Sequence, residues 1–200
     1  MRALLLSSCL VLVAQGPPLP KAPAQALPVL PTPQAPVRSA NPLKEVVRVD
    51  LSAAEAGTPE ALTASLYAFI SGPVGQPRNV DRIRSLFHLQ ARIMVVARHP
   101  EKGLFLRPME LEAFLGYAAP QWEKTGFFER GTAPSIQKED GVAQVWSPYE
   151  IRLTAEGPVV YTGVNALQCA WDGKRWWITH LEFQSRPTQA LMGAPPQPGK

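Results

Sequence analysis

The sequence predicts an α+β fold in which three helices and one strand are followed by a curved antiparallel sheet of four long strands. In the first part of the body, apolar residues recur every three or four positions, which is the spacing of one helix face. After Gly126 apolar and polar residues alternate, as they do in strands with one buried face. Turn residues separate the alternating segments at hairpin spacings. Such a sheet can curl around the helices into a cone and bury one face against them.

The composition indicates a single globular domain with additional segments at both ends. The chain has 200 residues, of which 46% are hydrophobic and 18% charged, so it can bury one core. Nine of its 22 prolines lie between Pro17 and Pro42, and four follow Arg186. We therefore expect four regions, which are a signal peptide (1–26), a proline-rich tether (27–56), a folded domain (57–186) and a disordered tail (187–200).

The N-terminal segment has the layout of a secretory signal peptide. Arg2 precedes an apolar run from Ala3 to Ala14, and small residues follow. The run is too short to cross a bilayer, which takes about 20 residues. The residues up to Cys9 resemble a bacterial lipoprotein box, and the alternative is an ordinary buried cysteine of the signal sequence. We expect export to the periplasm or the medium, with membrane attachment only through an uncleaved or lipidated leader.

Charge and cysteine content argue against two classes of protein. The net charge is +4, and loss of the leader would remove Arg2 and Lys21 but no acidic residue. The remaining positive charge is too small and too dispersed to predict a nucleic-acid partner. If Cys9 leaves with the leader, Cys169 is alone and no disulfide within the chain is possible. This pattern suits a bacterial envelope protein better than a disulfide-built secreted module.

Caps and periodicity predict the helices in chain order. Thr58 can cap a first helix, Pro59 is tolerated at its first position, and Glu60 favours the positive helix end. The helix ends at Gly72, and its buried face is formed by Leu62, Leu66, Phe69 and Ile70. Further elements are predicted as a helix over 79–87, a strand over 91–97 and a helix over 108–121.

Four strands are predicted after the third helix, over 127–137, 142–153, 159–171 and 175–184. The turns between them contain Gly141, Gly157 and the pair Asp172-Gly173. Asp-Gly between two apolar strands is the strongest of these hairpin signals. The four strands are therefore expected to form an antiparallel meander.

This order of elements resembles the nuclear transport factor 2-like superfamily, whose members are also called cystatin-like or SnoaL-like. The stretches that carry the resemblance are TPEALTASLYAFI, DRIRSLFHLQARIMV, GFFER, GVAQVWSPYEIRL and GVNALQCAWDGKRWWI. They look most like an uncharacterised bacterial subset of that superfamily. The resemblance implies a cone-shaped fold but no reaction, because the superfamily includes ketosteroid isomerases, polyketide cyclases, scytalone dehydratase and many non-catalytic domains.

A comparison with ketosteroid isomerases implies that this chain lacks their chemistry. Their oxyanion-binding tyrosine falls on Phe69, which cannot donate a hydrogen bond. Their general base falls on Val95, which cannot accept a proton. Their second oxyanion donor falls on Asn165, which could still donate.

Candidates for proton transfer are His180, Glu182 and His88. His180 and Glu182 share one face of the last strand, together with Trp176 and Ile178. They could act as base and orienting group, or simply mark a strand end that meets solvent or a subunit. His88 lies near the expected mouth of the cone, where a surface or capping role is the alternative. The spacing of the histidines does not match a metal site, and no cofactor motif occurs, so we expect neither metal nor cofactor.

Polar residues on the inward strand faces predict a pocket for a small apolar ligand. Tyr149 and Asn165 place two polar groups among apolar neighbours, which is typical of such pockets. The alternative is a filled core in which both are hydrogen-bonded internally. The predicted lining residues are Tyr67, Phe69, Trp122, Phe128, Tyr149 and Asn165.

The opposite sheet face carries Trp146 and Val164, and exposed apolar groups of this size usually mark an interface. We expect a homodimer through this face. The leading hypothesis for function is non-catalytic binding of a small apolar ligand or partner protein. The alternatives are a cofactor-free lyase or isomerase, and a purely structural dimerisation domain. An enzyme of this kind requires the candidate polar groups to converge on one cavity.

Overall fold

The computed structural model describes residues 48–99 and 101–192, which belong to one compact unit, Lys44–Lys200. The predicted signal peptide, the cysteine at position 9, most of the tether and residues 193–200 lie outside the described residues. Within the described part, none of the helices has the length and hydropathy needed to cross a membrane.

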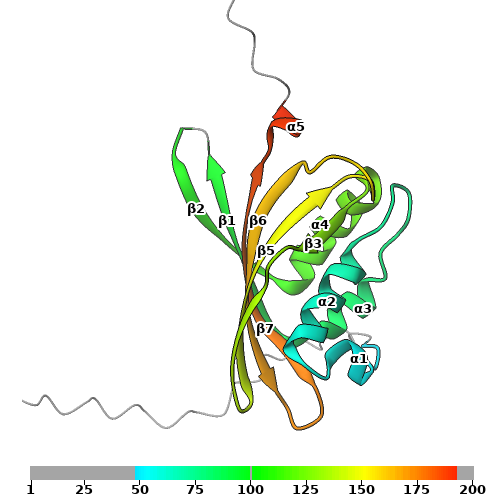
Figure 1. Ribbon diagram of the computed structural model, residues 1–200, viewed down its shortest axis with the longest axis vertical. Coiled ribbons are helices and arrows are strands. Elements are labelled where there is room, and N and C mark those ends of the chain that lie inside the picture. The colour runs from blue at the N-terminus through cyan, green and yellow to red at the C-terminus, as the bar shows by residue number, and fades with distance from the viewer. Residues whose placement is uncertain (1–47, 100, 193–200) are drawn as a thin grey trace, which may run out of the picture. The chain divides into compact units, whose positions relative to one another are not determined.

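The described residues form an α+β fold built on one seven-stranded sheet. Helices α1 to α4 lie on one side of this curved sheet, and α5 follows the end of β7 (Figure 1). The elements are α1 (Ala53–Ala56), α2 (Pro59–Ile70), α3 (Val80–Leu86), β1 (Phe87–His99), β2 (Gly103–Glu110), α4 (Leu111–Thr125), β3 (Phe128–Gly131), β4 (Ser135–Glu139), β5 (Val142–Arg152), β6 (Tyr161–Trp171), β7 (Trp176–Pro187) and α5 (Gln189–Met192). The predicted fold class is confirmed.

The strand order is β2-β1-β7-β6-β5-β3, and β4 also pairs with β5. All neighbouring strands are antiparallel except β1 and β7, which run parallel. The predicted four-stranded meander corresponds to β5, β6, β7 and a first strand that is divided into β3 and β4. β1, which follows α3, pairs in parallel with the edge of β7 that β6 leaves free. This pairing joins the antiparallel β1–β2 hairpin to the antiparallel strands β5, β6 and β7.

The three predicted helices form, the first of them at its predicted cap Thr58, but with shifted ends. Thr58 Oγ1 accepts a hydrogen bond from the Ala61 amide at 3.1 Å and begins α2. Asn79 Oδ1 accepts one from the Arg82 amide at 3.1 Å and begins α3. The third helix begins at Leu111 instead of residue 108, because Pro108 belongs to β2. β2 is an edge strand, where a residue without an N–H is tolerated.

The sequence predicted part of β1 but not β2, so the β1–β2 hairpin was not expected. This hairpin extends away from the helices (Figure 1). β2 is exposed along most of its length, so it shows no alternation of buried and exposed residues. The predicted strand over 127–137 is two strands, β3 and β4, separated by a short loop. Both pair with β5, at different parts of its length.

The folded part also begins before residue 57. The Val49 amide donates a hydrogen bond to Ser85 Oγ at 2.7 Å, and Arg48 Nη1 donates to the Phe87 carbonyl at 2.6 Å. Ser52 and Glu55 form a capping box on α1. The structure therefore places residues 48–56, which the sequence assigned to the tether, against the domain.

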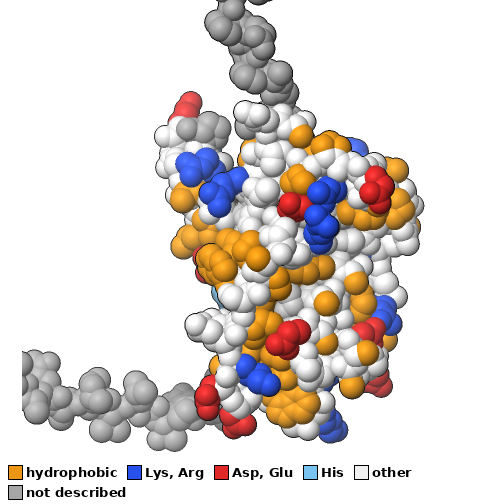
Figure 2. Space-filling view, viewed as in Figure 1, with side chains coloured by type: hydrophobic (Ala, Val, Ile, Leu, Met, Phe, Trp, Pro, Cys, Tyr) orange, Lys and Arg blue, Asp and Glu red, His pale blue; other side chains and the backbone are white. Residues whose placement is uncertain are grey.

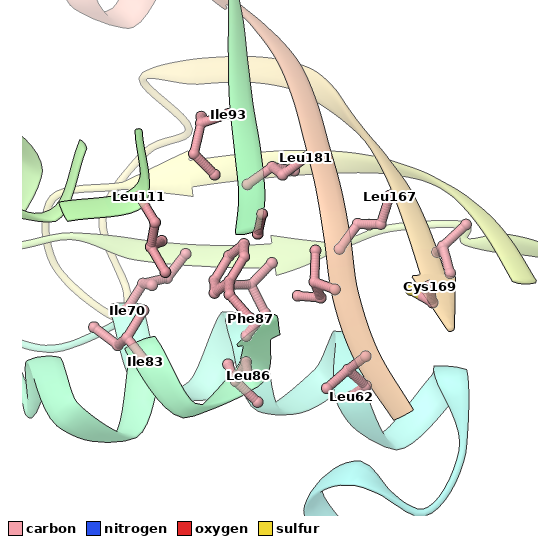
Figure 3. Close-up of a cluster of buried hydrophobic side chains, with 14 of the residues drawn as sticks. Leu62, Ile70, Ile83, Leu86, Phe87, Ile93, Leu111, Leu167, Cys169 and Leu181 are labelled. Carbon is pink, nitrogen blue, oxygen red and sulfur yellow. The ribbon is translucent and has the colours of Figure 1, made fainter. Parts of the chain in front are cut away.

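The core fills the space between the helices and the inner face of the sheet. Figure 3 shows side chains from α2, α3, β1, β6 and β7 pointing into this space. The most deeply buried large members include Leu62, Ile83, Leu86, Phe87, Ile93, Leu167 and Ile178. The inward positions of β5 and β6 are the odd-numbered residues, as predicted.

Candidate functional site

A cavity of about 390 Å³ opens beside this core, between the helices and the inner face of the sheet. Its walls are mainly apolar and come from α2, α3, α4 and strands β1, β3, β5, β6 and β7. The apolar lining residues are Leu66, Ile70, Ile83, Phe87, Phe114, Ala118, Trp122, Phe127, Ile151, Leu153, Leu181 and Phe183. The polar lining residues are Tyr117, Gln121, Thr125, Glu129, Tyr149, Tyr161, Asn165 and Ser185.

Glu129 is the one charged side chain among the lining residues that the structure describes. It lies in β3, where it pairs with Ile151 of β5, and both side chains face inward. The residue keeps some accessible surface because it faces the cavity, but its carboxyl group lies deep within the protein. A carboxyl group in such a place must be hydrogen-bonded or neutral.

Asn165 of β6 supplies that hydrogen bond. Its Nδ2 donates to Glu129 Oε1 at 2.8 Å and to Tyr67 Oη at 3.2 Å. Tyr67 Oη in turn donates to Ser147 Oγ at 2.7 Å. Asn165 is 4% exposed and Ser147 is fully buried. Side chains from α2, β3, β5 and β6 thus form one buried network at the end of the cavity.

Burial determines the ionisation of the acidic groups here. It raises the pKa of Glu129 to about 7, although the hydrogen bond from Asn165 acts in the opposite direction. Burial also raises the pKa of Tyr67, and there the hydrogen bonds to Ser147 and Asn165 oppose the shift. The Glu129 carboxyl group therefore changes between its protonated and its ionised form near neutral pH.

Tyr149 forms a second polar group of the cavity. Burial, followed by the nearby Glu129 charge, raises the pKa of Tyr149 well above its usual value, so this phenol stays neutral. Its Oη bonds to Ser185 Oγ at 2.7 Å and donates to the Gln184 carbonyl at 3.2 Å. The ring lies over Gly163, where a side chain would collide with it.

Comparisons with known proteins agree with this architecture. A protein of unknown function with a cystatin-like fold from Nostoc punctiforme matches with a TM-score of 0.51 at 10% identity, over 70% of this chain and 97% of its own. The chain has the cystatin-like, or nuclear transport factor 2-like, fold. No family model matches the sequence, and a search of curated proteins finds no match.

Two further solved structures are similar to this chain at lower TM-scores. A nuclear transport factor 2-like protein of unknown function from Methylobacillus flagellatus has a TM-score of 0.43 at 12% identity, over 70% of this chain and 98% of its own. A hexachlorocyclohexane dehydrochlorinase from Novosphingobium barchaimii has a TM-score of 0.46 at 14% identity, over 68% of this chain and 92% of its own. The fold assignment is supported by the match to the Nostoc punctiforme protein, and the site has to be interpreted from its own residues.

Within this nuclear transport factor 2-like fold, three of the predicted lining residues face the cavity: Trp122, Tyr149 and Asn165. Tyr67 is not a lining residue, but its hydroxyl group accepts a hydrogen bond from Asn165, which is. Phe69 lies elsewhere, with the Arg82 guanidinium 4.5 Å from the centre of its ring. Phe128 lines a second hollow of about 350 Å³ beside α2, which Glu129 also borders, and its neighbour Phe127 lines the cavity in its place.

The three predicted proton-transfer residues lie outside the cavity. His180 and Glu182 pair with Gln168 and Ala166 on the outer face of the sheet. A β-bulge at Thr179 reverses the alternation of β7 at this point. Trp176 and Ile178 therefore point inward, and the expectation that they share a face with His180 and Glu182 is wrong.

His88 is exposed and has the edge of its ring toward Trp177, with the ring centres 6.2 Å apart. His88, His180 and Glu182 thus do not converge with Tyr149 and Asn165. In the part of the chain that the structure describes, no group of three or more histidine, cysteine or acidic side chains could hold a metal ion.

Sequence reasoning missed Glu129 because the break between β3 and β4 changes the alternation. Ile136 of β4 pairs with the inward residue Val145, and an uninterrupted strand counted back from Ile136 would turn Glu129 outward. The available signal was Phe127-Phe128-Glu129, in which an acidic residue directly follows two aromatic residues just after a helix. The loop allows both Glu129 and Ile136 to face inward.

Proposed function

We propose that this protein binds a small, largely apolar molecule in the cavity, and that the polar group of this molecule contacts the carboxyl group of Glu129. The observation that carries the proposal is an apolar cavity of about 390 Å³ with one ionisable carboxyl group among its lining residues. Pockets of roughly 300 Å³ or more with few polar groups are typical of small-molecule sites.

The hydrogen bonds at the polar end support this proposal. Oε1 of Glu129 accepts from Asn165, and no hydrogen bond from another described residue reaches Oε2. The carboxyl group is therefore held in one orientation and keeps an oxygen for a ligand. An ionised carboxyl group accepts a hydrogen bond there, and a protonated one donates.

The test is binding of N-phenyl-1-naphthylamine, a neutral aromatic compound with one N–H group that fluoresces in apolar surroundings. The full-length protein should bind it. Ala118→Phe, which fills the cavity from α4, should raise its dissociation constant by at least about tenfold, or 1.4 kcal/mol. Ala113→Phe is the matched control, because Ala113 is exposed on the same helix and does not line the cavity.

A second variant guards against misfolding of Ala118→Phe. Gln121 is exposed and lines the cavity, so Gln121→Trp should narrow it without disturbing the core. Equal affinity of the wild type and both cavity variants, or no binding by any of them, would contradict the proposal. Circular dichroism of each variant verifies that it is folded.

A second proposal is that the outer face of the sheet pairs with a second copy of the chain. A row of paired residues crosses five strands on this face: Pro108, Met94, Glu182, Ala166 and Trp146. Trp146 is 55% exposed and Leu106 is 63% exposed. Hydrophobic side chains also gather beside the base of the β1–β2 hairpin (Figure 2). A face of this kind can match its own copy about a two-fold axis.

Sedimentation equilibrium of the full chain tests this pairing. The wild type should have twice the mass of one chain, and Trp146→Glu should have the mass of one chain. Val142→Glu is the control, because Val142 is 60% exposed on the same face of β5 but lies beyond the polar pair Gln144–Gln168. A monomeric wild type, or a dimeric Trp146→Glu, excludes this interface.

A further inference from the structure

Glu129 has the arrangement that proton abstraction requires. Asn165 Nδ2 holds Oε1 at 2.8 Å, and Asn165 is itself fixed by Tyr67 at 3.2 Å. The side chain is therefore positioned before a ligand arrives, and the second carboxyl oxygen is left to react. Such positioning reduces the entropy that a reaction must otherwise lose.

The surroundings of Glu129 also keep its carboxylate reactive. The groups that face it are the phenols of Tyr67 on α2 and Tyr149 on β5 and the amide of Asn165 on β6. Arg130 and Arg152 line the second hollow that Glu129 also borders, but both pair with Glu150. Both phenols stay protonated, because burial raises their pKa. The cavity lining contains no lysine, arginine or histidine among the described residues. A carboxylate without a paired cation in an apolar site is a stronger base than one in water.

We propose that Glu129 is a general base that removes a proton from a carbon atom of the bound ligand. The substrate class is a compact, largely apolar carbon acid, in which a neighbouring electron-withdrawing group makes the C–H bond acidic. The proton moves to Glu129 Oε2, and the electron pair of the C–H bond stays on the substrate. The pair then either expels a leaving group from the adjacent atom or is reprotonated elsewhere by Glu129. Neither course needs an oxidant, a reductant or a cofactor.

This inference rests on the proposed binding function and differs from the alternative drawn from the sequence, a cofactor-free lyase or isomerase that would use His180, Glu182 or His88. The base comes from β3 and lies inside the cavity, whereas His88, His180 and Glu182 lie outside it. Val95, at the position of the ketosteroid isomerase base, is not among the lining residues. The proposed base therefore lies on β3, whereas the position of the ketosteroid isomerase base lies on β1.

The probe is 5-nitrobenzisoxazole, a compact aromatic carbon acid. A base removes its single acidic carbon-bound proton, the electron pair forms the C≡N bond, and the N–O bond breaks to give a coloured 2-cyano-4-nitrophenolate. The full-length protein should accelerate this elimination at least about a hundredfold over buffer, as expected for a positioned base. The rate should rise with pH to a plateau, with its midpoint near 7, where the Glu129 carboxyl group ionises.

Glu129→Gln keeps the shape of the side chain but cannot accept the proton, and it should lower the rate to that of buffer. Glu150→Gln is the control, because Glu150 lies on the neighbouring strand and its carboxylate contacts Arg130 and Arg152 instead of the cavity. This variant should retain the wild-type rate and its pH profile.

Binding of N-phenyl-1-naphthylamine separates the two proposals. If the wild type binds this compound and 5-nitrobenzisoxazole displaces it, but no elimination occurs, the base is disproved and the binding function stands. A Glu129→Gln variant as fast as the wild type leads to the same conclusion. If neither compound binds, the binding function itself is disproved, and the inference fails with it.

Discussion

Glu129 and Asn165 lie on strands that do not pair with each other, yet their side chains hydrogen-bond at 2.8 Å across the intervening β5. Small residues leave room for this contact. Ser147 is the inward residue of β5 that pairs with Asn165, and a side chain at Gly131 of β3 would meet Ser147 Oγ at 2.9 Å. The buried network therefore depends on small residues as much as on its polar groups.

Replacement of Asn165 should destabilise the fold. Asn165→Leu removes the donor to both Glu129 and Tyr67, and a buried polar group left without its partner costs about 1–3 kcal/mol. Urea unfolding at pH 7 should show a loss of about 2 kcal/mol or more. Gln168→Leu is the matched control, because Gln168 is exposed on the outer face of the same strand. Equal midpoints for the two variants would mean that the network contributes little to stability.

Gly163 is predicted to tolerate no side chain. A Cβ atom there would overlap the Tyr149 ring and the Gln184 carbonyl, so Gly163→Ala must displace a backbone group or the cavity tyrosine. Overpacking of this kind costs about 1–3 kcal/mol. Gly116→Ala offers a control with the opposite sign, because nothing lies within 4 Å of its Cβ position in α4. Alanine is favoured over glycine in a helix by about 0.5–1 kcal/mol. Thermal unfolding should therefore move the two melting temperatures in opposite directions.

Arg78 should not be replaceable by lysine. Only 8% of Arg78 is exposed, and its guanidinium donates to backbone carbonyl groups of the end of α2, the α2–α3 loop and α4. The acceptors are Ile70, Gly72, Pro73, Gln76 and Trp122. Lysine keeps the charge but has one nitrogen, which cannot reach groups on several sides.

Arg78→Lys should therefore lower the free energy of unfolding by about 2 kcal/mol or more. Because Trp122 lines the cavity, the variant should also bind N-phenyl-1-naphthylamine more weakly. Arg98→Lys is the control, since Arg98 is exposed on β1 and makes no side-chain hydrogen bond or ion pair with a described residue. Similar urea midpoints for both lysine variants would show that the carbonyl contacts are dispensable.

The local signals in the sequence explain which parts of the fold were predictable. Thr58 and Asn79 cap their helices by contacts within three residues, and Asp172 closes its turn by accepting from the Lys174 and Arg175 amides. Such contacts depend on neighbouring residues alone. The pairing of β1 with β7 joins segments far apart in the chain, and no local pattern specifies its parallel direction.

The site was harder to predict than the fold for the same reason. Tyr149 and Asn165 were found because alternation is unbroken along β5 and β6 up to those residues. Glu129 was missed, and His180 was wrongly placed on the same face as Ile178. Both errors occur next to an irregularity in a strand. A loop separates β3 from β4, and a bulge interrupts β7 at Thr179. One extra residue reverses which side chains face the core.

Glu129 should make the stability of the fold depend on pH. Its pKa is about 7 in the folded protein, against 4.5 for an unperturbed glutamate. Between these two pH values the folded chain holds a proton that the unfolded chain has lost. The folded state is therefore stabilised by acid, and stability falls as the pH rises from about 4.5 through 7. The shift corresponds to about 3 kcal/mol.

Urea unfolding of the wild type and Glu129→Gln at pH 5, 6, 7 and 8 measures this effect, because the amide is neutral throughout. The free energy of unfolding of the variant should increase relative to that of the wild type by about 2.5 kcal/mol over this range, because pH 5 already lies above the unfolded pKa. Other titrating groups act equally on both proteins and cancel in the difference. Glu150→Gln should not show this trend, because that carboxylate contacts Arg130 and Arg152. If the free energies of unfolding of the wild type and Glu129→Gln differ by the same amount at every pH, Glu129 has the pKa of an ordinary glutamate. Its carboxyl group is then exposed to water, and it is no stronger a base than a glutamate in solution.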